Sequence, residues 1–202
     1  MRKVVVTEFV TLDGVIEDPG GSEKTTHGGW SFRFWSDEAA NYKHDELFAA
    51  DALLLGRVTY EGFAQAWPTV EGTGDFGERM NALPKYVVST TLNELTWNNS
   101  HLINEDAVAA IAKLKQQPGQ DILVEGSGEL VQTLMQHDLI DEYRLMVHPI
   151  VLGGGKRLFR EGSPTHPLEL VAARPIASGV VVLTYRPTTS EGEQERPTEA
   201  PA

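Results

Sequence analysis

Hydrophobic and polar positions follow one period in the first two-thirds of the chain and another in the last third. In the first part, short runs of apolar residues alternate with segments whose apolar side chains recur every three or four residues. The runs are typical of buried strands, and the segments are typical of helices. Strands are expected at 4–10, 52–55, 86–88, 101–103 and 122–124. Alternating strands and helices favour right-handed crossovers and a parallel sheet.

Five helices are expected to connect these strands. They run from the predicted N-cap Ser36 to about Ala49, over 59–67, over 76–83, from the predicted N-cap Asn104 to Pro118, and from Gly128 through Met135. Ser and Asn favour helix starts because their side-chain oxygens accept hydrogen bonds from free N–H groups of the first turn.

In the last third of the chain, apolar residues recur at every second position. This holds over 143–147 and 168–172, and 180–185 is again extended, with no helical segment in between. Such a pattern is typical of antiparallel strands. We therefore expect an α/β fold, with a mostly parallel, twisted sheet and antiparallel C-terminal strands, as a single domain over 1–187. The acidic segment 188–202 is expected to be a disordered tail.

Composition removes several classes of function. The chain has 202 residues, a formal net charge of −12 and no cysteine. The negative charge opposes a broad nucleic-acid surface, and the absence of cysteine excludes disulfides and thiolate metal sites. The six histidines show no paired spacing, so no metal site is expected. Without a signal peptide or a long apolar segment, we expect no membrane contact and a cytoplasmic location.

The turn Gly56-Arg57-Val58-Thr59 joins an expected strand to an expected helix. N–H groups at a helix N-terminus favour an anion, and the Arg57 guanidinium matches a phosphate. The Thr59 hydroxyl adds a further donor. The alternative is structural: Gly56 makes the turn, Thr59 caps the helix and Arg57 is solvated.

A second turn of this kind carries Gly126, Ser127, Gly128, Glu129 and Leu130 after a strand that ends at Glu125. Its single Gly-x-Gly is a weak signal alone. Ser89 and Thr90 follow the third strand, where their hydroxyls could bond a phosphate or simply form a turn. Because the strands are expected to be parallel, all three segments should meet at the carboxyl edge of the sheet.

Three acids are candidates for substrate contact or proton transfer: Asp13, Asp37 and Glu125. Each also has a structural interpretation, in a turn, a first helical turn or a backbone contact. The Gly-rich run that includes Gly153 and Gly154 permits close backbone approach. No nucleophile elbow or P-loop is present. Hydride transfer suits this set of residues, because the cofactor brings the chemistry.

The order of these motifs resembles a known family. It runs Thr-Leu-Asp-Gly at 11–14, Leu-Gly-Arg-Val-Thr-Tyr-Glu at 55–61, Tyr-Val-Val-Ser at 86–89, Val-Glu-Gly-Ser-Gly at 124–128 and Pro-Ile-Val-Leu-Gly-Gly-Gly at 149–155. Over about residues 3 to 186, the chain is similar to the dihydrofolate-reductase-like superfamily. Within it, the chain resembles free-standing reductases similar to the C-terminal domain of the bifunctional riboflavin-biosynthesis deaminase/reductase.

The resemblance implies a three-layer fold that binds NADPH at the carboxyl edge of its sheet. Cofactor contacts are expected at Gly56, Arg57, Thr59, Ser89, Thr90, Gly126, Ser127, Gly128, Glu129 and Leu130. The segment that takes the 2′-phosphate often carries an arginine in dihydrofolate reductases, but positions 90 and 91 are threonines here. Ser127 also stands where the riboflavin branch has the second glycine of its Glu-Gly-Gly motif.

The resemblance also implies a substrate and its contacts. Asp13 and Glu125 match the acids of the riboflavin branch and are the expected catalytic residues. Hydride would pass from nicotinamide to C1′ of a phosphoribosylamino-pyrimidine. The loop 17–35 carries five aromatic rings and is expected to cover the substrate. Substrate contacts are expected at Asp13, Trp30, Phe34, Asp37, Gly153 and Gly154.

Two other functions stay open from the sequence. In the first, Asp37 anchors a pterin and the chain is a dihydrofolate or pterin reductase. In the second, the chain binds a nucleotide as a sensor without turnover. In each case the partner is a small molecule. We also expect a homodimer, formed by C-terminal strands that pair across a two-fold axis.

Overall fold

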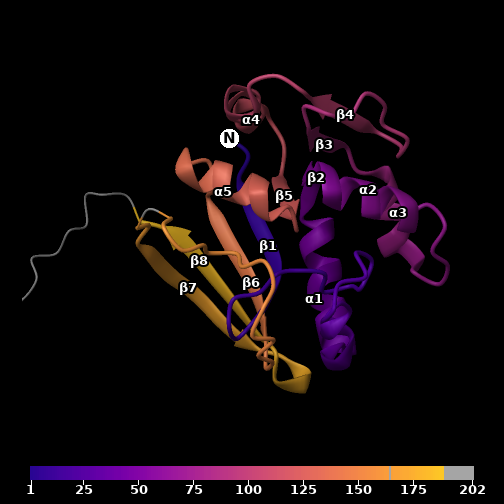
Figure 1. Ribbon diagram of the computed structural model, residues 1–202. Coiled ribbons are helices and arrows are strands. Elements are labelled where there is room, and N and C mark those ends of the chain that lie inside the picture. Colours follow the sequence, from indigo (N-terminus) through magenta and orange to yellow (C-terminus); the bar gives the residue numbers. More distant parts are fainter. Residues whose placement is uncertain (164, 189–202) are drawn as a thin grey trace, which may run out of the picture.

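A computed structural model describes residues 1–163 and 165–188. These residues form an eight-stranded sheet in the order β4-β3-β2-β5-β1-β6-β8-β7 (Figure 1). The strands are β1 (Val4–Thr11), β2 (Ala50–Gly56), β3 (Lys85–Val88), β4 (Ser100–Ile103), β5 (Asp121–Glu125), β6 (Glu142–His148), β7 (Leu168–Pro175) and β8 (Val181–Pro187). Strands β1 to β6 are parallel to their neighbours among themselves, and β8 runs antiparallel to β6 and β7. The α/β class and the change to antiparallel strands are confirmed.

Helices cover both faces of the sheet. They are α1 (Asp37–Phe48), α2 (Arg57–Ala66), α3 (Gly74–Ala82), α4 (Ala107–Gln116) and α5 (Gly128–Gln136). One hydrophobic cluster packs α4 and α5 on one face through residues such as Ile111 and Leu134, and the other packs α1, α2 and α3 on the opposite face through Leu47, Tyr60 and Met80. The three-layer arrangement that the resemblance implies is confirmed.

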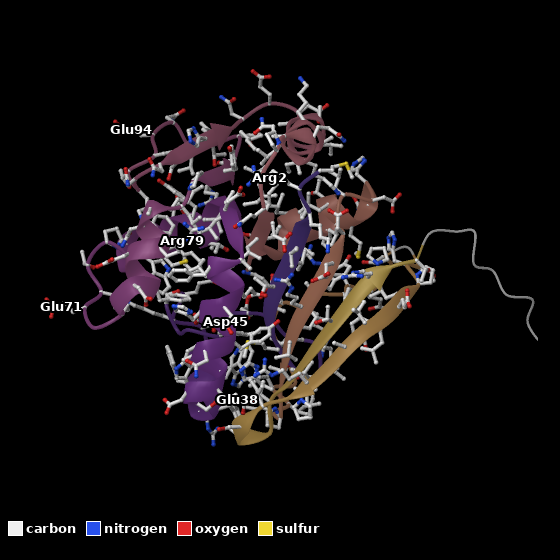
Figure 2. All side chains as sticks on the ribbon, turned by 180° about the vertical axis from the view of Figure 1, so that it is seen from behind. Arg2, Glu38, Asp45, Glu71, Arg79 and Glu94 are labelled. Carbon is white, nitrogen blue, oxygen red and sulfur yellow. The ribbon has the colours of Figure 1, made fainter. Side chains whose placement is uncertain are left out.

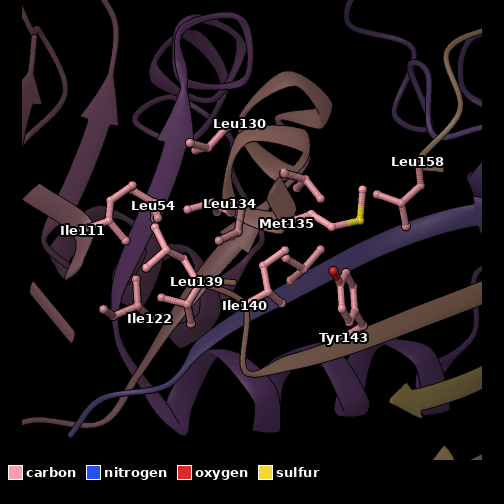
Figure 3. Close-up of a cluster of buried hydrophobic side chains, with 14 of the residues drawn as sticks. Leu54, Ile111, Ile122, Leu130, Leu134, Met135, Leu139, Ile140, Tyr143 and Leu158 are labelled. Carbon is pink, nitrogen blue, oxygen red and sulfur yellow. The ribbon is translucent and has the colours of Figure 1, made fainter. Parts of the chain in front are cut away.

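Strand β2 shows why its sequence is almost continuously apolar. Successive side chains of a strand point to opposite faces, so Ala52 and Leu54 join the cluster beneath α4 and α5, while Leu53 and Leu55 join the other. Figure 3 shows Leu54 among the side chains of α4 and α5. A strand buried on both faces is typical of a parallel sheet between two helical layers.

The helix starts correct three predictions. Ser36 caps α1 as predicted, since its Oγ accepts from Ala39 N at 3.2 Å. Asn104 as a cap is wrong: Asp106 caps α4 and accepts from Ala109 N at 3.0 Å. Helix α2 begins at Arg57 with Gly56 at its N-cap, not at Thr59, and α3 begins at Gly74. The earlier start of α2 puts Arg57 and Thr59 in its first turn, where N–H groups are free.

The C-terminal hairpin is tied to the first helix. Between β7 and β8, the short helix η2 (Ala177–Gly179) starts where Ala177 N donates to Glu38 Oε2 at 2.9 Å. Figure 2 shows Glu38 at the end of α1, beside this hairpin turn. The predicted tail lies outside the described residues from 189 onward. None of the helices in the described ranges combines the length and the apolar character needed to cross a membrane.

Candidate active site

A cavity of about 1360 Å³ lies along the carboxyl edge of the sheet. One part, called the turn end, is lined by the turns that follow β2, β3 and β5. The other, called the β1 end, is lined by Thr7 to Phe9 of β1, by Lys43 of α1 and by the loop 16–35. Pockets for a single small molecule typically measure about 300–1,000 Å³. The cavity therefore has room for a dinucleotide and a second molecule.

Two helix N-termini meet at the turn end. Gly56 N donates to Ser127 Oγ at 2.8 Å, which joins the β2–α2 turn to the β5–α5 turn. Gly126 has a φ of 56°, and a Cβ there would lie 3.0 Å from Thr59 Oγ1. Glycine thus permits the two turns to touch. The free N–H groups of α2 and α5 face the same cavity, which suits a diphosphate.

Arg57 is the exposed cation of the turn end. Its side chain is 45% exposed and its Nη1 lies 2.8 Å from Glu61 Oε2, one turn further along α2. An exposed pair with this spacing contributes only about 0.3–0.5 kcal/mol. The guanidinium can therefore leave Glu61 for an anion in the cavity.

The remaining predicted cofactor residues also line the turn end. Ser89 Oγ accepts from Thr91 N at 3.2 Å and from Leu92 N at 3.0 Å, so its hydroxyl shapes the turn after β3. Thr90 is exposed beside it. Glu129 forms two hydrogen bonds with Arg160, at 2.9 and 2.5 Å, and these lower the pKa of its carboxyl. The sheet thus brings together every residue predicted to hold the cofactor, Gly128 and Leu130 included.

A buried ion cluster forms the wall of the β1 end. Lys43 Nζ donates to Glu46 Oε2 at 2.5 Å, to Thr7 Oγ1 at 3.1 Å and to Glu125 Oε1 at 3.2 Å. Burial alone would lower the pKa of Lys43, but Glu125 and Glu46 together raise it above its usual value. Lys43 therefore stays charged and holds the Glu125 carboxylate in place.

Glu8 is a further buried acid in the wall of the cavity. The residue is 5% exposed and lines the cavity. Its Oε1 is buried and has no hydrogen-bond partner among the described residues. Burial, and then the nearby Glu125, raise the pKa of Glu8 well above its usual value, against the opposing effect of Lys43. The protonated form of Glu8 is thereby favoured.

The aromatic loop lines the cavity with different rings from those predicted. Phe32 and Trp35 line it and are 66% and 47% exposed. Trp30 and Phe34, the first and last residues of the short helix η1 (Trp30–Phe34), instead pack against His148, with ring centroids 5.1 and 5.9 Å away. The loop does border the β1 end. Trp30 and Phe34 pack beneath the loop, against His148.

Asp13 lies outside the set of described residues that line the cavity. Its carboxylate accepts from Thr11 Oγ1 at 2.6 Å, from Gly153 N at 2.9 Å and from Leu152 N at 3.2 Å. These hydrogen bonds, the one from Thr11 first, lower the pKa of Asp13 to about 2. Its contacts hold the turn after β1 to the glycine-rich segment. The catalytic role of Asp13 stays a prediction.

The other predicted substrate residues also lie outside the cavity lining in the described chain. Gly153 and Gly154 are exposed in the segment that Asp13 holds. Asp37 is exposed at the first position of α1. Of the two predicted catalytic acids, Glu125 therefore lines the cavity, while Asp13 does not.

The comparisons with known proteins agree with this geometry. The family model of the RibD C-terminal domain matches residues 2–182. The chain belongs to the RibD C-terminal domain family. Its relatives in this family include YyaP, an uncharacterized protein of Bacillus subtilis strain 168. The two are 33% identical over 187 residues, which cover 91% of this chain and 94% of YyaP.

Two solved structures show the same fold. One, from Shewanella sp. PV-4, is named for riboflavin biosynthesis; it is 22% identical, with a TM-score of 0.74, and the match covers 93% of this chain and 99% of that one. The other is the dihydrofolate reductase of Enterococcus faecalis in complex with NADP(H), 15% identical with a TM-score of 0.60, covering 93% and 97%. The RibD C-terminal domain fold of this chain is thus dihydrofolate-reductase-like.

Two buried charged residues of the β1 end, Glu8 and Lys43, are not among the site residues predicted from the sequence. Glu8 interrupts the apolar run of β1, and Lys43 lies on the buried side of α1. An adjacent polar pair, Thr7 and Glu8, inside a strand that is otherwise apolar was the available signal. Buried polar groups are normally satisfied by partners, so a charged residue in such a strand predicts either a buried ion pair or a ligand site.

Proposed function

We propose that this chain is an NADPH-dependent reductase of the riboflavin-biosynthesis type. The single observation that carries the proposal is one cavity with two unlike ends: two touching helix N-termini with Arg57 at one end, and buried carboxyl groups at the other. When bound, the cofactor would supply a hydride to C1′ of the ribosyl group of a phosphoribosylamino-pyrimidine. The relationship to dihydrofolate reductase, solved with NADP(H), supports the choice of cofactor.

The turn end fits a dinucleotide diphosphate. A Cβ at Gly126 would crowd Thr59, and a Cβ at Gly128 would lie 2.9 Å from Ile16 Cδ1. The backbone is therefore drawn in at the place where N–H groups would face the phosphates. Arg57 would neutralise phosphate charge, and Ser89 and Thr90, at the end of β3, would reach the ribose side.

The β1 end would hold the substrate. Opening of the ribose ring breaks the C1′–O4′ bond, moves a proton from the amino nitrogen to O4′ and leaves a C=N bond. Its reduction would add a hydride to C1′ and a proton to the nitrogen. Glu8 and Glu125 are carboxyl groups that line this end and can hold that proton. Lys43 fixes Glu125 through the 3.2 Å contact, so the position of one of these carboxyl groups is set before substrate binds.

Titration of the protein with NADPH and with NADH tests the proposal. Trp35 and Trp67 line the cavity, so bound nucleotide should quench tryptophan fluorescence. Loss of a charge-assisted contact costs about 1.5–3 kcal/mol, so Arg57→Ala should raise the Kd for NADPH about ten- to a hundredfold. Arg174→Ala is the matched control, because Arg174 pairs with Glu38 on another part of the surface.

The outcomes separate the alternatives. Absence of binding by either nucleotide contradicts the reductase proposal. Tighter binding of NADH keeps the reductase but contradicts the 2′-phosphate role of Ser89 and Thr90. Binding without oxidation of NADPH across ribosylamino-pyrimidines and dihydrofolate favours the sensor.

We also propose that two copies pair through the C-terminal strands. Strand β7 is at the edge of the sheet, and its Leu170 and Val171 are 52% and 43% exposed. Exposed apolar edges are commonly covered in solution. Sedimentation of the protein and of Leu170→Lys checks the pairing: a dimer should become a monomer in the variant, and a wild-type monomer contradicts it.

A further inference from the structure

Arg160 belongs to the segment between β6 and β7, but its side chain lies at the first turn of α5. It lines the cavity together with the β5–α5 turn. A Cβ on Gly128, the first residue of α5, would lie 3.9 Å from Arg160 Nη2 and 2.9 Å from Ile16 Cδ1. The guanidinium of Arg160 is therefore part of the turn end, where the cofactor diphosphate is proposed to bind.

The carboxylate of Glu129 holds this guanidinium. Its Oε2 accepts a hydrogen bond from Arg160 Nη1 at 2.9 Å, and its Oε1 accepts one from Nη2 at 2.5 Å. The hydrogen bonds from Arg160 lower the pKa of Glu129, so the carboxylate is charged at neutral pH. Carboxylates and phosphates both offer an arginine two oxygen atoms that match its fork of donors. Glu129 therefore occupies the guanidinium in the way that a phosphate would.

The pair between Arg160 and Glu129 is exposed enough to exchange partners. The two side chains are 36% and 82% exposed. Water screens such a pair, so the pair adds little to the stability of the fold, and Glu129 stays hydrated when the guanidinium leaves. Lys43 differs, because it is 10% exposed and bonds to two largely buried carboxylates. Arg160 can thus turn to an anion at low cost, whereas Lys43 cannot.

The other helix of the turn end has the same arrangement. Arg57 lies in the first turn of α2 and pairs with Glu61 of the same helix at 2.8 Å. The two helix starts are joined, since Gly56 N donates to Ser127 Oγ at 2.8 Å. Each helix N-terminus at the turn end therefore has an arginine beside it that is held by an acid of that helix. A diphosphate has two phosphate groups, and the described residues provide one exchangeable arginine for each.

Lys156 is a more exposed cation of the cavity, but its contacts attach it to a different place. Its Nζ lies 3.4 Å from Glu17 and 3.8 Å from Glu23. Both acids belong to the loop that borders the β1 end. Lys156 therefore serves that end of the cavity, while the contacts of Arg160 with Gly128 and Glu129 place it on α5.

We propose that Arg160 binds the cofactor diphosphate beside the first turn of α5, and that it leaves Glu129 to do so. This inference rests on the proposed function for the identity of the bound molecule. It changes the role of Glu129, which the sequence predicted as a direct cofactor contact. Glu129 holds the guanidinium in position before the cofactor binds and competes with the phosphates for it. The two residues therefore have opposite effects on cofactor affinity.

Calorimetry with NADP⁺ and with NAD⁺ measures these effects without turnover. Arg160→Met removes a charge-assisted contact and should weaken the binding of both nucleotides about tenfold or more. Glu129→Gln removes the competing carboxylate and should tighten the binding of both about threefold or more. The matched controls are Arg157→Met, which breaks a pair with Asp13 in the same segment, and Glu78→Gln on the exposed side of α3. Neither residue is among the described residues that line the cavity, so each control should change the affinity little.

The double variant separates a phosphate contact from simple neutralisation of charge. In Arg160→Met alone, Glu129 loses its partner and repels the phosphates, so part of the loss does not come from a missing contact. In the Glu129→Gln background this repulsion is absent, and Arg160→Met should still weaken binding about tenfold. Unchanged binding in that background would show that Arg160 only neutralises Glu129, and the inference would be overturned.

Two other results contradict the inference. Binding that is equal or weaker in Glu129→Gln overturns the competition between its carboxylate and the phosphates. A loss in Arg160→Met that is confined to NADP⁺ overturns the assignment to the diphosphate, because this pattern belongs to the 2′-phosphate. The pair is exposed, so a cooperative thermal transition is expected for every variant.

Inorganic pyrophosphate distinguishes a failure of this inference from a failure of the proposed function. If the wild type binds neither nucleotide, the proposed function fails. Pyrophosphate binding that is weakened about tenfold in Arg160→Met and tightened in Glu129→Gln would then retain Arg160 as the diphosphate-binding residue for another ligand. Pyrophosphate binding that is absent, or unchanged by both substitutions, would overturn the inference as well.

Discussion

Two carboxyl groups five residues apart, one within β1 and one just after it, behave in opposite ways. Asp13 accepts three hydrogen bonds within the protein, and its pKa is lowered to about 2. Glu8 lines the cavity with a buried oxygen that has no partner among the described residues, and its pKa is raised. Asp13, whose carboxylate is already hydrogen-bonded within the protein, positions a turn. The carboxyl group left without a bond is the one available to a ligand.

The surroundings explain this difference. After Thr11 the chain leaves the sheet, and backbone N–H groups of the segment 152–153 converge on Asp13. Inside the sheet, the N–H groups of β1 are used by neighbouring strands, so Glu8 has side chains alone for partners. The two charged side chains that act on the pKa of Glu8, Glu125 and Lys43, bond to one another. A carboxyl group in a turn can accept hydrogen bonds from free backbone N–H groups. Within a strand these N–H groups are already used by the neighbouring strands.

The largest effect is expected from removing the cation beside Glu8. Lys43→Met leaves Glu125 buried without its counter-charge and leaves Glu46 with only its 3.6 Å pair with Arg144. Breaking a buried pair in this way typically costs about 3–5 kcal/mol. Urea denaturation at pH 7 should show a loss of this size in the free energy of unfolding.

Lys156→Met is the control for Lys43→Met, because Lys156 is 61% exposed and its pair with Glu17 lies at the surface. Exposed pairs contribute about 0–1 kcal/mol. A loss below about 1 kcal/mol at pH 7 would show that the cluster does not depend on Lys43.

A smaller effect is expected at Asp13. Asp13→Ala deprives Leu152 N and Gly153 N of their acceptor, and we expect a loss of about 2 kcal/mol at pH 7. The folded pKa is lowered, so the contribution of Asp13 is present above its unfolded value near 3.8 and is lost as pH falls through about 2. Stability measured from pH 7 to pH 2 should show the two proteins converging only at the acidic end.

Asp13→Asn separates the turn from catalysis. The amide keeps one oxygen acceptor, so its stability should lie between those of the other two proteins. If Asp13 acts on the substrate, as the sequence predicts, NADPH oxidation should fall in Asp13→Asn far more than stability does. If NADPH oxidation and stability both fall by a similar, small amount, the role of Asp13 is to hold the turn.

The sequence predicted the succession of strands and helices along the chain and the residues of the turn end, because both depend on local patterns. Period and β-branched runs place the strands, and the glycines at 56, 126 and 128 mark the turns that meet at the sheet edge. The β1 end could not be predicted in this way. Lys43 meets Glu125 across 82 residues of sequence, and nothing local to either residue signals the other. The two residues meet because Lys43 lies on the buried face of α1.

The position of residues in the aromatic loop did not predict which of its rings line the cavity. Trp30 and Phe34 stand in the aromatic loop like Phe32 and Trp35, but the helix η1 turns the first pair towards His148. A short helix inside a long loop sorts neighbouring side chains to opposite sides. The loop has no regular spacing of apolar residues from which the orientation of these rings could be predicted.

The smallest effect, and the one of opposite sign, is expected at Glu8. Glu8→Gln removes a titrating group whose folded pKa is raised. The wild-type contribution is therefore full below the unfolded pKa near 4.5 and is lost as pH rises through the folded value. Since glutamine does not titrate, Glu8→Gln should match the wild type near pH 4 and be the more stable of the two proteins at pH 8. Urea denaturation at both pH values measures the difference in the free energy of unfolding between the two proteins. If this difference is the same at both pH values, Glu8 ionises as easily in the folded chain as in the unfolded one. The contrast with Asp13 would then lie in hydrogen bonding alone.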